Sequence, residues 1–144
     1  MDLQSIISEV KTLARETGRF IAEQRKNFDS SRVESKQSHD YVSYVDKECE
    51  RMIVSRLKEI LPQAGFITEE KTIAQDDGNK ELYWIVDPLD GTTNFIHDLA
   101  PYSVSIALRD SKDLLLGVVY EVTRDELYSA AKGQGAYLND RAIK

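Results

Sequence analysis

The sequence has few of the residues that form covalent or metal cross-links. A single cysteine, Cys49, cannot form an internal disulfide, and the two histidines, His39 and His97, lie far apart in the sequence and suggest no zinc site. Cys49 stands among apolar residues at helical spacing, which favours a buried structural thiol over a catalytic nucleophile. A disulfide-stapled scaffold and a zinc enzyme are therefore disfavoured.

Long apolar runs and an excess of positive charge are also missing. No uninterrupted apolar run approaches the ~18 residues that cross a membrane, and Met1–Ser5 carries an acid where a signal peptide would be basic. Nineteen basic and twenty-five acidic residues give a net charge of −6, which argues against general binding to a nucleic-acid backbone but leaves a local patch open. We therefore expect a cytoplasmic protein that needs no membrane and no nucleic acid.

Two amphipathic helices are predicted in the first part of the chain. Apolar residues recur close to the helical period over 3–28, where the first helix is expected to end before Asp29. A polar segment follows over 32–39. Ser43 to Asp46 fits a capping box, so a second helix is predicted to begin there and to close at Pro62.

Strands dominate the remainder of the sequence. Period-two alternation or short apolar runs bounded by turn residues predict strands over 65–67, 82–86, 102–109, 114–122, 126–130 and 136–138. Helices come first and strands follow, without the regular alternation of a doubly wound sheet. The sequence therefore predicts one α+β domain, with two helices packed on a mainly antiparallel sheet.

The stretch from Leu82 to Phe95 carries the main chemical signal. Its strand leads into a loop with Asp87 and Asp90, and Gly91 then precedes threonines suited to opening a helix. Carboxylates at this spacing can share hard divalent cations, and the N–H groups of a helix start face an anion. The stretch predicts a metal-bridged phosphate site. A plain turn is the simpler explanation of its composition alone, since Asp, Pro and Gly are common in turns.

Other polar residues are weaker candidates when each is taken alone. Glu69 and Glu70 follow a predicted strand, but adjacent acids are usually solvated. The capping box is enough to account for Asp46, and Lys36 is by default a lysine on the protein surface. Pro88 fixes one backbone angle between the aspartates and could help to turn the carbonyl of Leu89 towards a metal.

These residues together resemble a known family. The stretch 84–95, Trp-Ile-Val-Asp-Pro-Leu-Asp-Gly-Thr-Thr-Asn-Phe, resembles the signature of the inositol monophosphatase family of Mg²⁺-dependent, lithium-sensitive phosphatases. Upstream, Lys36, Asp40, Ser43 and Asp46 resemble its Lys-x3-Asp-x2-Thr-x2-Asp pattern, and 66–70 resembles its Gly-Glu-Glu element. The segments 117–120 and 132–136 resemble family strands and a glycine turn. The resemblance covers essentially all 144 residues and overrides the plain-turn interpretation.

The resemblance implies a role for each matching residue. Mg²⁺ would be bound by Glu69, Asp87, Asp90 and the backbone carbonyl of Leu89. Glu69 and Thr92 would orient the attacking water, with Asp46 hydrogen-bonded to Thr92. The substrate phosphate would be bound by Asp90, Gly91 and Thr92, and Glu70 and Lys36 are further candidates.

Length is the main departure from the family pattern. Family members are about twice as long, and a later Trp-Asp-x-Ala-Ala-Gly-like element, whose aspartate completes the metal site, has no counterpart in 1–144. The resemblance therefore implies that 1–144 is the N-terminal α+β metal- and phosphate-binding half of a layered αβαβα sugar-phosphatase fold, without its C-terminal domain. We expect weak or no activity from this half alone, and a homodimer.

Three functions remain open from the sequence. The first is hydrolysis of inositol monophosphate or a similar small sugar-alcohol phosphate ester by metal-activated water. The second is the activity of a bisphosphate nucleotidase or a fructose-1,6-bisphosphatase, enzymes that share the Asp-Pro-[Ile/Leu]-Asp-Gly core. The Thr-Thr-Asn-Phe continuation favours the inositol branch. The third is a non-catalytic module that holds a cation and pairs its exposed sheet with a partner chain or a second copy.

Overall fold

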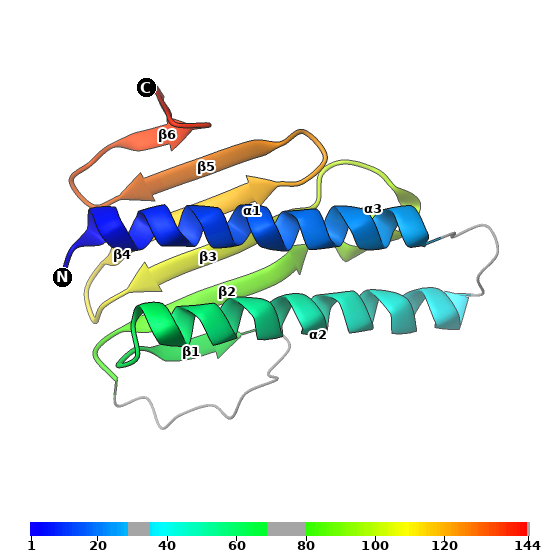
Figure 1. The fold of residues 1–144 in the computed structure, drawn as a ribbon, viewed down its shortest axis with the longest axis horizontal. Helices are drawn as coiled ribbons and strands as arrows, with labels where there is room; N and C mark the ends of the chain where they lie inside the picture. Colours follow the sequence, from blue (N-terminus) through cyan, green and yellow to red (C-terminus); the bar gives the residue numbers. More distant parts are fainter. Residues whose placement is uncertain (29–34, 69–79, 144) are drawn as a thin grey trace.

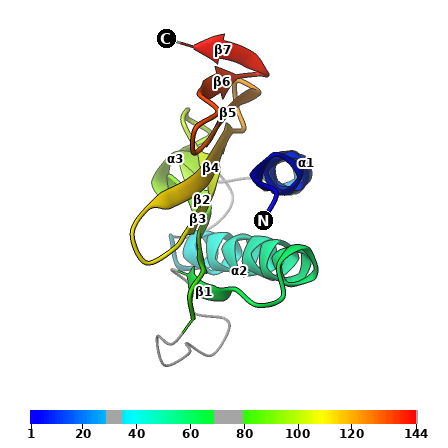
Figure 2. The ribbon, with the colours of Figure 1, turned by 90° about the vertical axis from the view of Figure 1, so that its left-hand side faces the viewer.

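The computed structural model describes residues 1–28, 35–68 and 80–143, and for 35–38 the backbone alone. These residues form two layers, with two long helices lying across one face of a seven-stranded sheet (Figures 1 and 2). The elements in chain order are α1 (Leu3–Asn27), α2 (Ser35–Ile60), β1 (Gly65–Thr68), β2 (Tyr83–Asp90), α3 (Thr92–His97), β3 (Ser103–Arg109), β4 (Leu114–Glu121), β5 (Glu126–Ala131), β6 (Ala136–Leu138) and β7 (Arg141–Ile143). The predicted α+β class is confirmed.

Helix α1 matches the helix that its apolar spacing predicted. It begins after Asp2, whose Oδ1 accepts hydrogen bonds from the backbone N–H groups of Gln4 at 3.1 Å and Ser5 at 3.3 Å. These bonds satisfy donors that have no acceptor within the helix. The buried side of α1 consists of Ile6, Ile7, Val10, Leu13, Ala14, Thr17, Gly18 and Ile21. The helix therefore packs through one apolar face, as expected.

Helix α2 begins at Ser35, so the predicted start at Ser43 is wrong. The polar segment predicted over 32–39 is wrong for the described part as well, because it is helical from Ser35. Contacts with the end of α1 stabilise the helix before Ser43. The ring of Tyr41 stacks on Phe28 at 4.9 Å, and its hydroxyl donates to the backbone oxygen of Gln24 at 3.0 Å. A short-range capping pattern cannot reveal this contact.

The rest of α2 follows the prediction. Its apolar face places Val45, Cys49, Ile53 and Leu57 in the core, each with no exposed surface, and the helix ends at Ile60, shortly before Pro62. Burial raises the pKa of the Cys49 thiol. Cys49 is therefore a buried structural thiol, as predicted. No helix in the described part of the chain is long and apolar enough to cross a membrane.

The sheet is a meander in which neighbours in sequence are neighbours in space. Its strand order is β1 to β7, with β1 parallel to β2 and every later pair antiparallel. Strand β7 was not predicted. The sequence signal for β7 is the pair Asn139-Asp140, because Asn and Asp tolerate the positive φ angles that the tightest hairpin turns require. In the structure these two residues have φ angles of +48° and +67°.

The core lies between the sheet and the two long helices. Alternate residues of the strands point towards the helices, among them Trp84, Val104, Ile106, Leu108 and Leu127, which have no exposed surface. Gly18 of α1 approaches β4 closely, because a Cβ atom at Gly18 would lie 2.3 Å from Cε2 of the Tyr120 ring. Neither of the two long helices lies on the opposite face of the sheet, where Figure 2 shows, among the described residues, only the short helix α3 at one end.

Candidate functional site

A β-bulge brings Asp87 and Asp90 to the same face of the sheet. Residues three positions apart on a regular strand point to opposite faces. In β2, however, Asp87 pairs with Ser105 and Asp90 pairs with Ser103, so three steps along β2 match two steps along β3. One extra residue in β2 therefore restores the alignment. The predicted loop is wrong, because both aspartates belong to the strand, but their predicted proximity is supported by this register.

The face that carries the aspartates is the one away from α1 and α2. Ser103 and Ser105 alternate along β3 with Val104 and Ile106, which are buried beneath the helices. Strand partners share a face, so Asp87 points to the side opposite the helices. Asp87 is half-buried and Asp90 is exposed. Both aspartates are thus at least partly accessible to solvent.

Pro88 and Leu89 form the bulged part of β2. Both side chains are buried, and Leu89 is only 2% exposed. Proline lacks a backbone N–H, so a bulge is one of the few places in a sheet where it costs no ladder hydrogen bond. The role of the Leu89 carbonyl as a metal ligand stays a prediction.

Gly91 connects the bulge to α3. Its φ of +95° and ψ of +43° lie in the left-handed region, which glycine adopts readily and other residues avoid. A Cβ atom there would lie 2.7 Å from the backbone oxygen of Pro101. Helix α3 then begins at Thr92, and the N–H of Phe95 donates to the Gly91 oxygen at 2.9 Å. The predicted helix start is confirmed, and the N–H groups before Phe95 have no acceptor within the helix.

Several contacts hold α3 against the rest of the protein. Phe95 has no exposed surface and packs edge-on against Tyr102 with ring centroids 5.5 Å apart. The Asn94 side-chain amide donates to the Pro101 oxygen at 2.8 Å. Asp98 ends the helix 3.6 Å from Nε of Arg25 in α1. Burial, together with the Asp98 carboxylate, raises the pKa of Tyr102 despite the opposing charge of Arg25, so this phenol stays neutral at physiological pH.

The structure tests the other predicted site residues only in part. Asp46 is buried, with 7% of its surface exposed, on a helix that contacts α3, and Thr92 is half-buried at the start of α3. The hydrogen bond predicted between Asp46 and Thr92 stays a prediction. Glu69 and Glu70 lie outside the described residues, as does the side chain of Lys36. Among the side chains of 1–28, 39–68 and 80–143, no group of three or more metal-binding residues converges.

Sequence reasoning missed Glu121, a buried carboxylate at the end of β4. It is 6% exposed and accepts hydrogen bonds from the backbone N–H groups of Tyr102, Thr123 and Arg124 and from the Thr123 hydroxyl. Burial tends to raise the pKa of Glu121, but these four hydrogen bonds outweigh it and hold the pKa below its ordinary value. The available signal was an acid placed between an apolar strand and a turn.

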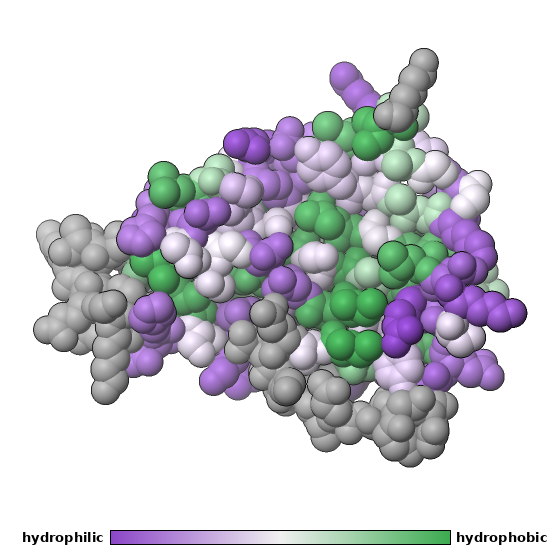
Figure 3. Space-filling view, turned by 180° about the vertical axis from the view of Figure 1, so that it is seen from behind, coloured by the Kyte–Doolittle hydropathy of each residue, from purple (hydrophilic) through white to green (hydrophobic). Residues whose placement is uncertain are grey.

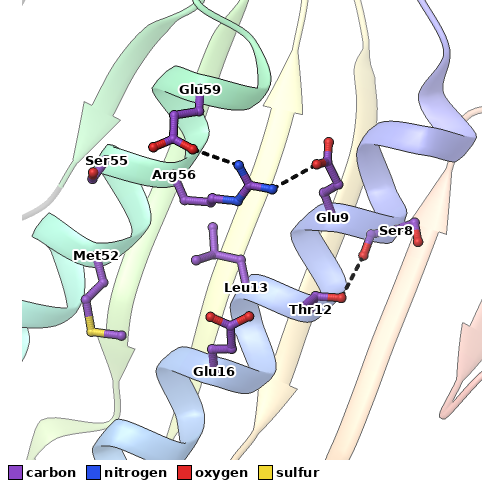
Figure 4. A pocket seen from close by; sticks show the side chains of 9 residues that line it. All are labelled: Ser8, Glu9, Thr12, Leu13, Glu16, Met52, Ser55, Arg56 and Glu59. Atoms are coloured by element: carbon purple, nitrogen blue, oxygen red, sulfur yellow. Dashed lines mark hydrogen bonds and ion pairs between the residues drawn. The ribbon is translucent and has the colours of Figure 1, made fainter.

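A cavity between α1 and α2 is separate from the aspartates. It has a volume of about 520 Å³ and lies on the helical layer, on the other side of the sheet from Asp87. Arg56 spans it, with ion pairs to Glu9 at 2.9 Å and Glu59 at 2.8 Å above Leu13 (Figure 4). Two of the carboxylates that line this cavity, Glu9 and Glu59, are thus engaged with Arg56.

A two-helix layer on a mainly antiparallel meander defines the class of fold. Inositol monophosphatase-II from Staphylococcus aureus MSSA476 has this fold, with a TM-score of 0.82 and 30% identity over 97% of this chain and 51% of that chain. The inositol monophosphatase family matches residues 2–144. The chain therefore belongs to the inositol monophosphatase family.

Curated relatives extend the comparison. The inositol-1-monophosphatase of Mesorhizobium japonicum is 35% identical over 144 residues, which is 100% of this chain and 54% of that protein. The Nus factor SuhB of Escherichia coli K12 is 40% identical over 131 residues, which is 91% of this chain and 49% of that protein. The chain spans about half the length of the curated relatives it matches.

Proposed function

We propose that the chain is the metal- and phosphate-binding half of a Mg²⁺-dependent phosphomonoesterase. The observation that carries this proposal is the β2 bulge, which places Asp87 and Asp90 on one face directly before the left-handed turn at Gly91. Paired carboxylate oxygens are the ligands that Mg²⁺ prefers, and several waters complete its octahedral shell. The described donor set therefore fits this ion.

Each residue of the proposed site has a defined task. Asp87, Asp90, Glu69 and the Leu89 carbonyl would hold Mg²⁺, which when bound supplies charge neutralisation and a more acidic water. The N–H groups of Gly91 and Thr92 would bind the phosphate. The Thr92 hydroxyl and Glu69 would orient the water that attacks phosphorus, and Asp46 would hold the Thr92 hydroxyl in place. Glu70 and Lys36 have no assigned step.

The proposed substrate is a small sugar-alcohol phosphate such as inositol monophosphate. Support comes from the family and from a similar solved structure that holds inositol monophosphate. Another similar structure holds 2'AMP, so a nucleotide-directed specificity is the alternative within the same chemistry. The predicted homodimer, the inhibition by lithium and the cytoplasmic location belong to this proposal as well.

Metal binding by the chain itself tests the proposal without requiring turnover. Mn²⁺ is a paramagnetic substitute for Mg²⁺, so a titration followed by NMR should broaden the signals of Gly91 and Thr92 first. Asp87→Asn and Asp90→Asn should each abolish this broadening at low Mn²⁺. Asp113→Asn removes the same charge from an exposed loop and serves as the matched control that should leave the broadening unchanged.

Two results would contradict the proposal. One is broadening that centres elsewhere on the chain, and the other is broadening at Gly91 that survives both aspartate substitutions. An activity assay is the second test. It compares phosphate release from inositol monophosphate and from 2'AMP in the presence and absence of Mg²⁺. Release that is independent of Mg²⁺ would also count against the assignment.

A non-catalytic binding module is the second candidate, and the open face of the sheet favours it. Ile67, Val119 and Tyr128 on this face are 38%, 39% and 39% exposed, and hydrophobic residues gather there (Figure 3). Exposed apolar surface of this kind marks interaction sites. The double variant Asp87→Asn, Asp90→Asn separates the two candidates, because a phosphatase would lose turnover whereas a binding module would keep its partner.

A further inference from the structure

The Glu121 carboxylate joins two segments that are distant in sequence. Its Oε1 accepts from the backbone N–H of Tyr102 at 3.3 Å and of Thr123 at 3.2 Å, and its Oε2 accepts from the N–H of Arg124 at 2.6 Å. The bonds to Thr123 and Arg124 shape the turn between β4 and β5. The bond to Tyr102 has no part in that turn, because it reaches the segment that leads into β3.

The segment held by Glu121 forms the wall against which Gly91 rests. The Pro101 oxygen would lie 2.7 Å from a Cβ atom at Gly91, and the Tyr102 Cα would lie 3.3 Å from it. The same Pro101 oxygen accepts the Asn94 side-chain amide at 2.8 Å, inside the first turn of α3. A shift of Pro101 and Tyr102 would therefore move Gly91 and the start of α3 together.

The sheet register places Glu121 in line with the proposed metal site. Asp90 pairs with Ser103, and Ser103 pairs with Glu121, so these residues form one row across three strands. Ionised carboxylates are rarely buried unless their oxygens are hydrogen-bonded. A surface turn alone would not require Glu121 to be buried to the extent that only 6% of the residue is exposed. Its burial is explained by the second task of holding Tyr102.

We infer that Glu121 is a positioning residue for the phosphate-binding turn at Gly91 and Thr92. The effect of Glu121 on phosphate binding rests on the proposed function. The effect of Glu121 on the position of Gly91 rests only on the contacts of Glu121, Tyr102 and Gly91. Glu121 contacts no substrate. It acts by fixing the backbone of Tyr102, and through it the position of the N–H groups that would bind phosphate.

The test uses Glu121→Gln in the full chain. Glutamine keeps the shape but removes the negative charge and replaces one carboxylate oxygen by an NH₂ group, so the hydrogen bond from Tyr102 becomes a weaker neutral one and at least one of the four hydrogen bonds is lost. Glu126→Gln is the matched control, because Glu126 pairs with Glu121 in the sheet and carries the same charge. The NMR signals of the Gly91 N–H and the Asn94 side-chain amide should shift in Glu121→Gln and stay unchanged in Glu126→Gln.

Inorganic phosphate in the presence of Mg²⁺ is the probe of the functional consequence. Weakening of the hydrogen bond that holds Tyr102, through loss of the Glu121 charge, should weaken phosphate binding on the order of fivefold in Glu121→Gln. Thr123→Val, which removes one donor and keeps the carboxylate, should cause a smaller change in the same direction. Urea denaturation of each variant shows whether the change is local or reflects the stability of the whole protein.

Each outcome decides a defined part of the inference. If Glu121→Gln perturbs only the signals of Thr123 and Arg124, Glu121 serves the turn alone and the inference is wrong. Unchanged phosphate affinity despite shifted Gly91 signals would overturn the functional consequence. If the wild-type chain binds no phosphate, the proposed function fails, while the Gly91 and Asn94 signals still decide the geometric part. Should Glu121→Gln fail to fold, the Thr123→Val comparison carries the test.

Discussion

Substitution of Gly91 by alanine should destabilise the fold through two additive effects. An L-residue in the left-handed region costs about 1–2 kcal/mol, and Gly91 has a φ of +95°. The added Cβ would also lie 2.7 Å from the Pro101 oxygen, which belongs to the backbone and cannot rotate away. Overpacking of this kind typically costs ~1–3 kcal/mol. The expected loss is therefore roughly 2–5 kcal/mol, a large part of the ~5–15 kcal/mol that stabilises a typical domain.

Gly133 provides the matched control for this prediction. Its φ is +78°, and a Cβ atom there would meet nothing within 4 Å, so Gly133→Ala should cost only the ~1–2 kcal/mol of the backbone conformation. Urea denaturation, followed by the fluorescence of the fully buried Trp84, measures the free energy of unfolding of both variants. The difference between the two variants isolates the contact with Pro101. Equal losses for Gly91→Ala and Gly133→Ala would refute the steric part of the reasoning.

Three further predictions concern the core and the buried acidic and thiol groups. Gly18→Ala should cost ~1–3 kcal/mol in urea denaturation, because the new Cβ would lie 2.3 Å from the Tyr120 ring, whose hydroxyl is tied to Asp125 at 2.6 Å; an unchanged midpoint would contradict the close approach. The lowered pKa of Glu121 gives a stability contribution that is fully present above its ordinary value of 4.5 and is lost as pH falls through the folded-state value. Glu121→Gln should flatten the fall in stability over that acidic range, and a parallel pH profile for the variant would speak against this linkage. Buried Cys49 should react with a thiol reagent only as fast as the chain opens, and rapid labelling in native buffer would be inconsistent with its burial.

The helices and strands differ in how well the sequence predicted them. Helix α1 and strand β3 followed their periodicity, because one face of each is buried. Strands β4 and β5 followed a continuous apolar run and a hairpin turn. The start of α2 could not be predicted from local pattern, since the stacking of Tyr41 on Phe28 extends the helix. Strand β2 was expected to end at Val86, because Asp, Pro and Gly are typical of turns.

The candidate site was likewise predictable in its residues and not in its geometry. Asp87 and Asp90 were identified from residue type and from the family resemblance. Only the pairing with Ser105 and Ser103 explains how two aspartates at odd spacing share a face. Glu121 escaped prediction because its partner Tyr102 lies in another segment, and contacts of that kind leave no local pattern.

The meander order of the sheet has a consequence for how the chain folds. Each antiparallel strand pairs with the strand next to it in sequence, so β2 to β7 can be built by closing short loops one after another. Short loops cost little entropy to close, and folds dominated by such contacts form quickly. The contacts of α1 with β4 and β5, and the ion pair between Lys11 and Asp140, join distant parts of the chain. We therefore expect the hairpins to form first, and the seating of Gly18 on Tyr120 to be among the last events of folding.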